Sequence, residues 1–262
     1  MKNLFRSLSS FVVLLIAAVP CQAAVQTKII AYQHDDTRLE GFLAWDDRFK
    51  AKRPGVLVVH EWWGMNDYAR QRARQLAEAG YVAFALDMYG AGKVTRHPEQ
   101  ASTWMTEIKE NSALWVARAN AGLEVLKMQE SVEAEKIAAI GYCFGGATVV
   151  EMAYAGLDLR LAGSFHGSLP IAKGLKAGSI RARIFAAHGS ADPFVKPGHP
   201  EAFREALEDI GANWSMMEFG GVKHSFTNPN AGDYDIDALA YDEVADRQSW
   251  YMLLWLLEES FR

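Results

Sequence analysis

The chain has 262 residues, half of them hydrophobic, which is enough for one large domain with a buried core. Its net charge is −5 at pH 7. An acidic balance of this kind argues against nucleic acid or an anionic membrane surface as a partner.

The first 23 residues differ in character from the rest. Lys2 and Arg6 precede an apolar run at 11–19 that is too short to span a bilayer, and Cys21-Gln22-Ala23 fits a small-x-small cleavage site. We predict a secretory signal peptide over 1–23, a single domain over 24–262 and a periplasmic location. A lipid anchor on Cys21 is the alternative, although Pro20 occupies a position that is usually small.

The elements predicted for 24–262 alternate between strand and helix. Two β-like runs at 28–32 and 39–44 form an antiparallel hairpin. The remaining strands are predicted at 54–60, 81–86, 136–140, 161–166, 182–188 and 214–219. Helices are predicted from a cap at Asn66 or Asp67 up to Gly80, then at 99–129 in two pieces, 147–156, 201–210 and 236–259. This order predicts an α/β fold, with a mostly parallel sheet covered by helices on both faces and the hairpin at one edge.

The segment Gly141-Tyr142-Cys143-Phe144-Gly145-Gly146 lies between a predicted strand and a predicted helix. It has the layout of a nucleophile elbow, G-x-S-x-G, with cysteine in the serine position. Such a tight turn needs small neighbours, and the helix behind it points its free N-terminal amides at the sulfur. The alternative interpretation is that Cys143 is a buried structural thiol.

The cysteine count favours the reactive interpretation. The chain has two cysteines, and Cys21 leaves with the signal peptide. Cys143 then has no partner for an internal disulfide, and an unpaired thiol in an oxidising compartment is a candidate reactive group.

Three predicted strand ends after the midpoint carry Cys143, Asp192 and His224, in that order. The carboxyl ends of parallel strands meet at one edge of a sheet, and nucleophile, acid, histidine is the chain order of the α/β-hydrolase triad. Cys143 would attack an acyl carbon, His224 would transfer the proton and Asp192 would orient the imidazole. A zinc site is a rival hypothesis because several potential ligands follow predicted strands, namely His60, Glu61, His166, His188 and Asp192. Their spacing in the sequence matches no recognised zinc motif.

Together these motifs resemble the dienelactone hydrolase family. The resemblance rests on 141–146, on Gly-Ser-Ala-Asp-Pro-Phe-Val at 189–195 and on Lys-His-Ser-Phe-Thr-Asn-Pro at 223–229, with further matches at 60–64 and 87–89. It implies an α/β-hydrolase fold with a Cys143-His224-Asp192 triad. It further implies that Glu61 engages the resting thiol, and that the backbone amides of Trp62 and Phe144 form the oxyanion hole.

The sequence departs from the family pattern where the substrate is selected. Two arginines that hold a substrate carboxylate in dienelactone hydrolases are replaced here by the Gly90-Ala91 segment and by Asn228, with Lys93 or Arg96 as possible substitutes. Trp62, Trp63 and Phe144 suggest a neutral or aromatic substrate. The predicted pocket residues are Trp63, Tyr89, His166 and Asn228.

The sequence therefore predicts a monomeric hydrolase of a small ester, lactone or thioester, acting through a thioester on Cys143 without cofactor or metal and without stable membrane association. The alternatives are an amidase or peptidase with the same triad, and a non-catalytic relative that binds a ligand or a protein. A thiol-based redox function would need a resolving cysteine, which the chain lacks after signal removal.

Overall fold

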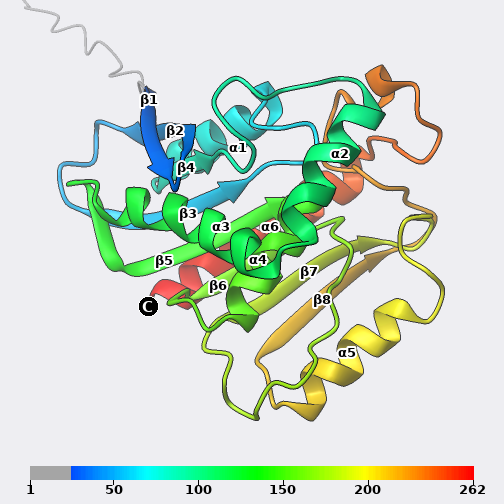
Figure 1. Cartoon of the computed structure of the whole chain (residues 1–262). Helices are drawn as coiled ribbons and strands as arrows, with labels where there is room; N and C mark the ends of the chain where they lie inside the picture. The colour runs from blue at the N-terminus through cyan, green and yellow to red at the C-terminus, as the bar shows by residue number, and fades with distance from the viewer. Residues whose placement is uncertain (1–24) are drawn as a thin grey trace, which may run out of the picture.

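An eight-stranded sheet in the order β1-β2-β4-β3-β5-β6-β7-β8 runs through the computed structural model, which describes residues 25–262 (Figure 1). The predicted signal peptide lies outside the described residues, so it and the export that depends on it stay predictions. The strands are β1 (Val25–His34), β2 (Thr37–Asp46), β3 (Arg53–Val59), β4 (Val82–Leu86), β5 (Val132–Tyr142), β6 (Leu161–Phe165), β7 (Arg183–Gly189) and β8 (Trp214–Phe219). All pairs from β4 to β8 are parallel, whereas β1 and β2 form the predicted antiparallel edge hairpin.

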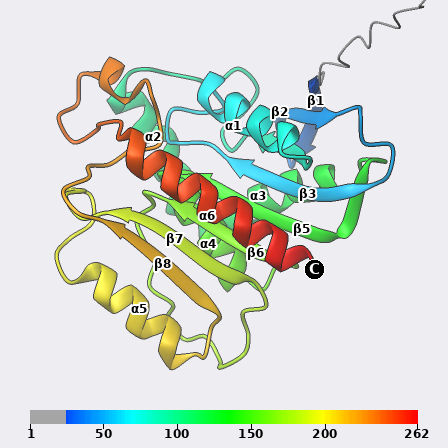
Figure 2. The same ribbon diagram turned by 180° about the vertical axis from the view of Figure 1, so that it is seen from behind.

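Helices cover both faces of the sheet, as predicted. They are α1 (Asp67–Glu78), α2 (Pro98–Lys109), α3 (Ser112–Lys127), α4 (Phe144–Tyr154), α5 (His199–Asp209) and α6 (Glu243–Phe261), with a short 3₁₀ helix η1 (Ala231–Tyr234) before α6. In Figure 1, α3 and α4 lie in front of the sheet, and Figure 2 shows α1 and α6 on the opposite face. This is the α/β-hydrolase fold.

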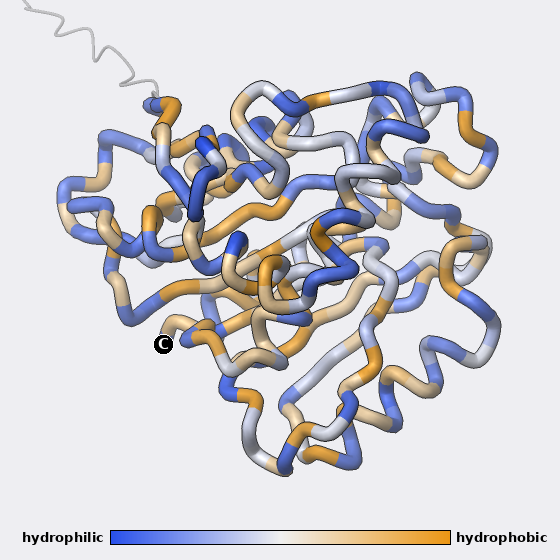
Figure 3. The backbone as a smooth tube through the Cα atoms, viewed as in Figure 1, coloured by the Kyte–Doolittle hydropathy of each residue, from blue (hydrophilic) through white to orange (hydrophobic). Residues whose placement is uncertain are grey.

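Strand residues contribute alternately to two cores because successive side chains of a strand point to opposite faces. Leu57 and Val59 of β3 pack with α3 and α4, whereas Val56 and Val58 pack with α1 and α6. Hydrophobic segments accordingly gather along the central strands in Figure 3, with hydrophilic ones in the outer loops. Within residues 25–262, no helix is both long enough and apolar enough to cross a bilayer.

The start of the last helix differs from the prediction. The helix was predicted from residue 236, but α6 begins at Glu243, where the side chain of Asp242 caps it by accepting from the Ala245 amide at 2.9 Å. The preceding residues are not helical: 237–238 form a turn, and Leu239 pairs with the loop after β8, where the His224 amide donates to Ala238 O and the Ala240 amide donates to His224 O. This pairing holds His224 at its place in the site.

Candidate active site

Cys143 occupies the turn between β5 and α4 in a strained backbone conformation. Its φ is 56° and its ψ is −114°. This combination is energetically unfavourable for any residue that has a Cβ atom. The surrounding structure compensates in part: the Cys143 amide donates to Phe165 O of β6 at 3.0 Å, and Cys143 O accepts from the Ala147 amide of α4. The predicted strand–turn–helix elbow is confirmed.

The flanking glycines are sterically required, as the motif predicts. A Cβ on Gly141 would lie 2.1 Å from the backbone oxygen of Gly145, and a Cβ on Gly145 would lie 2.2 Å from the oxygen of Val59. Both distances are far below van der Waals contact with backbone atoms, which cannot move aside independently. The glycines therefore let α4 approach β5 and β3 closely enough to hold the cysteine at the strand end.

His224 and Asp192 meet at the ends of β8 and β7. Asp192 Oδ2 accepts from His224 Nδ1 at 2.6 Å, and its other oxygen accepts from the Phe194 amide at 2.9 Å. Both side chains are buried. The structure thus brings together all three residues that the chain order predicted.

The charge balance favours a protonated His224. Burial alone would lower the pKa of its imidazole, but the charge of Cys143 and the hydrogen bonds with Asp192 and Cys143 outweigh burial and raise the pKa to about 10. At neutral pH the histidine is therefore an imidazolium that can give a proton to a leaving group.

Glu61 is buried at the end of β3, in the same region, but its partners differ from those that the family resemblance implied. Its Oε1 accepts from Ser225 Oγ at 2.7 Å and its Oε2 from Asn228 Nδ2 at 2.8 Å. Burial raises the pKa of the Glu61 carboxyl, against the lowering effect of these two hydrogen bonds. In this structure the carboxylate is engaged by the loop that follows His224, and its role toward the thiol stays a prediction.

A cavity of about 210 Å³ opens over Cys143 and His224. Most of its wall is apolar, and among the described residues that line it Lys109, at the end of α2, is the one cationic side chain apart from the histidine. The lining residues are Trp62, Met105, Lys109, Cys143, Phe144, Ser168, Phe194, Val195, His224 and Leu239.

The two predicted oxyanion donors, the amides of Trp62 and Phe144, belong to residues of this wall. Within residues 25–262, neither amide donates a hydrogen bond to another protein group. Two unengaged amides beside a nucleophile are what an oxyanion hole requires. Their catalytic role stays a prediction.

None of the four predicted pocket residues lines this cavity, and each has a structural reason. Trp63 is buried and stacks on Tyr234, with ring centroids 4.0 Å apart. Tyr89 packs behind Phe144 at 5.7 Å, so Phe144 presents the surface there. His166 is fully buried beside His224, and Asn228 is turned to Glu61.

Several residues of the wall were not predicted from the sequence. Phe194 lies in the 189–195 segment that carried part of the family resemblance, and its ring meets His224 edge-on at 4.9 Å. Met105 and Lys109 come from α2, Ser168 from the loop after β6 and Leu239 from the segment before α6. These four follow no local motif, because only chain packing brings them to the elbow.

The potential zinc ligands do not form a metal site among the described residues. In residues 25–262, no group of three or more His, Cys, Asp or Glu side chains is arranged to hold a metal ion. His60 Nε2 accepts from the Met88 amide at 3.2 Å, His166 bonds Thr227, and Asp192 bonds His224.

Comparison with known proteins places the chain in a family. The model of the dienelactone hydrolase family matches residues 39–261, which is most of the chain. The chain belongs to the dienelactone hydrolase family. It is therefore a hydrolase, and the family assignment made from its motifs is confirmed.

Individual relatives of this dienelactone hydrolase family member extend over nearly the whole chain. It is 36% identical, with a TM-score of 0.88, to a dienelactone hydrolase-like promiscuous phosphotriesterase from metagenomic libraries, covering 91% of this chain and 100% of that one. It is 28% identical over 227 residues to a putative carboxymethylenebutenolidase of Aquifex aeolicus, covering 85% of this chain and 94% of the relative. Protein usf of Aquifex pyrophilus is 26% identical over 236 residues, with coverages of 88% and 98%.

Proposed function

We propose that this enzyme hydrolyses small esters or lactones through a thioester formed on Cys143. The observation that carries the proposal is that Cys143 and His224 share one cavity wall while Asp192 holds the far side of the imidazole at 2.6 Å. Nucleophile, proton carrier and orienting carboxylate are the three parts that covalent acyl transfer requires.

The reaction proceeds in two halves. The Cys143 sulfur attacks the acyl carbon, and the carbonyl oxygen takes up the negative charge between the amides of Trp62 and Phe144. The carbon–oxygen bond to the leaving group then breaks, and the imidazolium of His224 gives that oxygen its proton. A water molecule, deprotonated by His224, attacks the thioester. The carbon–sulfur bond then breaks, the carboxylic acid leaves the Cys143 sulfur, and His224 is again the imidazolium with which the reaction began.

The cavity supports a small, largely apolar substrate. Its volume of about 210 Å³ is below the roughly 300 Å³ at the lower end for pockets that hold drug-sized ligands. Its wall includes the rings of Trp62, Phe144 and Phe194, and none of the wall residues within 25–262 carries a carboxylate side chain. A compact aromatic or aliphatic acyl group suits this surface.

Phosphotriester cleavage is a second candidate activity. The relative that is 36% identical is described as a promiscuous phosphotriesterase. A neutral triester is compatible with an apolar wall without carboxylates. Cys143 would then attack phosphorus in place of an acyl carbon.

The test compares wild-type protein with Cys143→Ala on an aryl acetate and an aryl phosphotriester. We expect the variant to lose on the order of 10³-fold or more in kcat on the ester, because the residual rate then comes from binding and the oxyanion donors alone. Mass spectrometry of acid-quenched wild-type protein should find the acyl group on Cys143. An acyl group on a serine, or equal rates in both proteins, would refute the cysteine mechanism; equal background rates would favour a binding function.

A further inference from the structure

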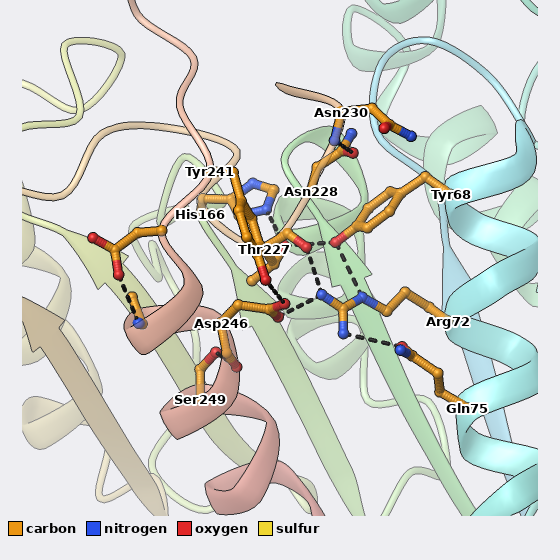
Figure 4. A network of polar contacts seen from close by, with 12 residues as sticks. Tyr68, Arg72, Gln75, His166, Thr227, Asn228, Asn230, Tyr241, Asp246 and Ser249 are labelled. Atoms are coloured by element: carbon orange, nitrogen blue, oxygen red, sulfur yellow. Dashed lines mark hydrogen bonds and ion pairs between the residues drawn. The ribbon is translucent and has the colours of Figure 1, made fainter. Parts of the chain in front are cut away.

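A buried polar network lies next to His224 and has no direct role in the proposed reaction (Figure 4). It consists of Tyr68 and Arg72 of α1, His166 after β6, Thr227 after His224 and Asp246 of α6. None of the five lines the cavity. Any effect on catalysis must therefore be indirect, and the contact between the rings of His166 and His224 offers a route to the reacting atoms.

Arg72 connects three segments that are far apart in the sequence. Its Nη2 donates both to Thr227 O and to Asp246 Oδ1, and its Nη1 donates to Gln75 at 3.1 Å. Its guanidinium also lies over the rings of Tyr68, Tyr142 and Trp250 at 5.3–5.4 Å. The loop that carries His224 is thereby attached to both α1 and α6.

The hydrogen-bond donors in this network are determined by chemistry. An arginine nitrogen only donates, so Arg72 Nε gives its hydrogen to Tyr68 OH at 3.3 Å. Among the described residues, Thr227 Oγ1 at 2.6 Å is the other partner of the Tyr68 hydroxyl, so the Tyr68 hydrogen is paired only when Tyr68 donates to Thr227. Thr227 in turn gives its hydrogen to His166 Nε2 at 2.8 Å.

The last member of this chain is a neutral histidine. Burial, followed by the nearby charges of His224 and Arg72, lowers the pKa of His166 well below its usual range. A neutral imidazole that accepts at Nε2 carries its hydrogen on Nδ1. Within residues 25–262, Thr227 supplies the one hydrogen bond that the His166 ring makes.

The ring of His166 packs directly against the catalytic histidine. Its centroid lies 5.0 Å from that of His224, edge to face at 67°. It also meets Phe226 at 5.3 Å. A rotation of the His166 ring would therefore displace the surface on which His224 rests.

We propose that Arg72, Tyr68 and Thr227 form a one-directional hydrogen-bond chain that locks the His166 ring and so positions His224 for proton transfer. The inference rests on the proposed function of His224. Thr227 is then a positioning residue that acts through the rings of His166 and His224, because its hydroxyl contacts neither the cavity nor the reacting atoms.

The kinetic test uses a matched pair of variants at position 227. Thr227→Val keeps the shape and the backbone bond to Arg72 but removes the hydroxyl, whereas Thr227→Ser restores it. We expect Thr227→Val to lower kcat about five- to ten-fold, which corresponds to the loss of one hydrogen bond, with KM within about two-fold. Thr227→Ser should return kcat to within about two-fold of wild type. An unchanged kcat in Thr227→Val, or an equal loss in both variants, would overturn the proposal.

A spectroscopic test separates this proposal from the proposed function. Nitrogen-15 NMR of the imidazole rings should find His166 as the Nδ1–H tautomer in wild type and a changed tautomer balance in Thr227→Val, whatever the activity. An Nε2–H tautomer in wild type would refute the chain. Turnover that survives Cys143→Ala would instead refute the cysteine mechanism and leave the tautomer result standing.

Discussion

The imidazole of His224 lies between two regions of opposite character. Toward the cavity it meets Phe194, whose ring is half exposed, and the apolar wall around Cys143. On the protein side it meets Asp192 and the His166 ring, which the hydrogen-bonded network of Arg72, Tyr68 and Thr227 holds. The cavity side borders the space for a substrate, whereas on the buried side hydrogen bonds hold the rings of His224 and His166 in place.

The largest effect is expected from a change on the buried side. Asp192→Asn keeps the size of the side chain but removes the charge that stabilises the imidazolium, and the amide can favour the wrong imidazole tautomer. We expect kcat on an aryl ester to fall roughly 10³- to 10⁴-fold. Steady-state kinetics measure this loss, and thermal unfolding by circular dichroism checks that the variant folds. A loss below about ten-fold would mean that Asp192 does not act through His224.

The pH dependence of stability tests the ion pairing of the same histidine. Its pKa is raised from 6.5 to about 10 in the folded protein. Its stabilising effect is therefore fully present below about pH 6.5 and is lost as the pH rises through about 10. We expect the difference in free energy of unfolding between wild type and His224→Gln to shrink over this range.

Urea unfolding at several pH values between these limits measures that difference. His97→Gln, at an exposed position, is the matched control, and its difference from wild type should stay constant. If the difference in free energy of unfolding between wild type and His224→Gln grew with pH, the positive charge assigned to His224 would be contradicted.

The smallest effect is expected on the cavity side. Phe194 is 53% exposed and borders the cavity, and Phe194→Ala removes its ring. Losing this aromatic surface should cost about 1 kcal/mol of binding, or about five-fold in KM, with kcat within about two-fold. Tyr251→Ala, an exposed aromatic on α6, is the control for general surface effects. A drop in kcat with unchanged KM would show that Phe194 acts on His224 and does not contribute to binding.

Much of the fold was predictable because its signals are local. The cap at Asn66, whose side chain accepts from the Ala69 amide at 3.3 Å, fixes the start of α1. A continuous run of Val and Leu residues marks β3 as a strand that is buried on both faces. The start of α6 was not predictable from helical periodicity. Residues 238–240 pair with His224, and this long-range pairing overrides their local preference.

In the candidate site, too, some features were predictable from the sequence and others were not. Cys143, Asp192 and His224 were identifiable because parallel strands end at one edge of the sheet, whatever else packs around them. The partners of Glu61 were not identifiable, since Ser225 and Asn228 lie more than 160 positions away in the chain. Asn228, where the family pattern has an arginine, binds a buried carboxylate and does not face the cavity.

By itself, the sequence determined the elbow, the order of the three candidate catalytic residues and the family. These features depend on glycine sterics and on strand–helix alternation, which act over a few residues. Only the tertiary structure decided which side chains form the cavity wall and which hold His224 from behind. Lys109 and Arg72 acquire their places through packing between distant segments, and no short stretch of sequence records that packing.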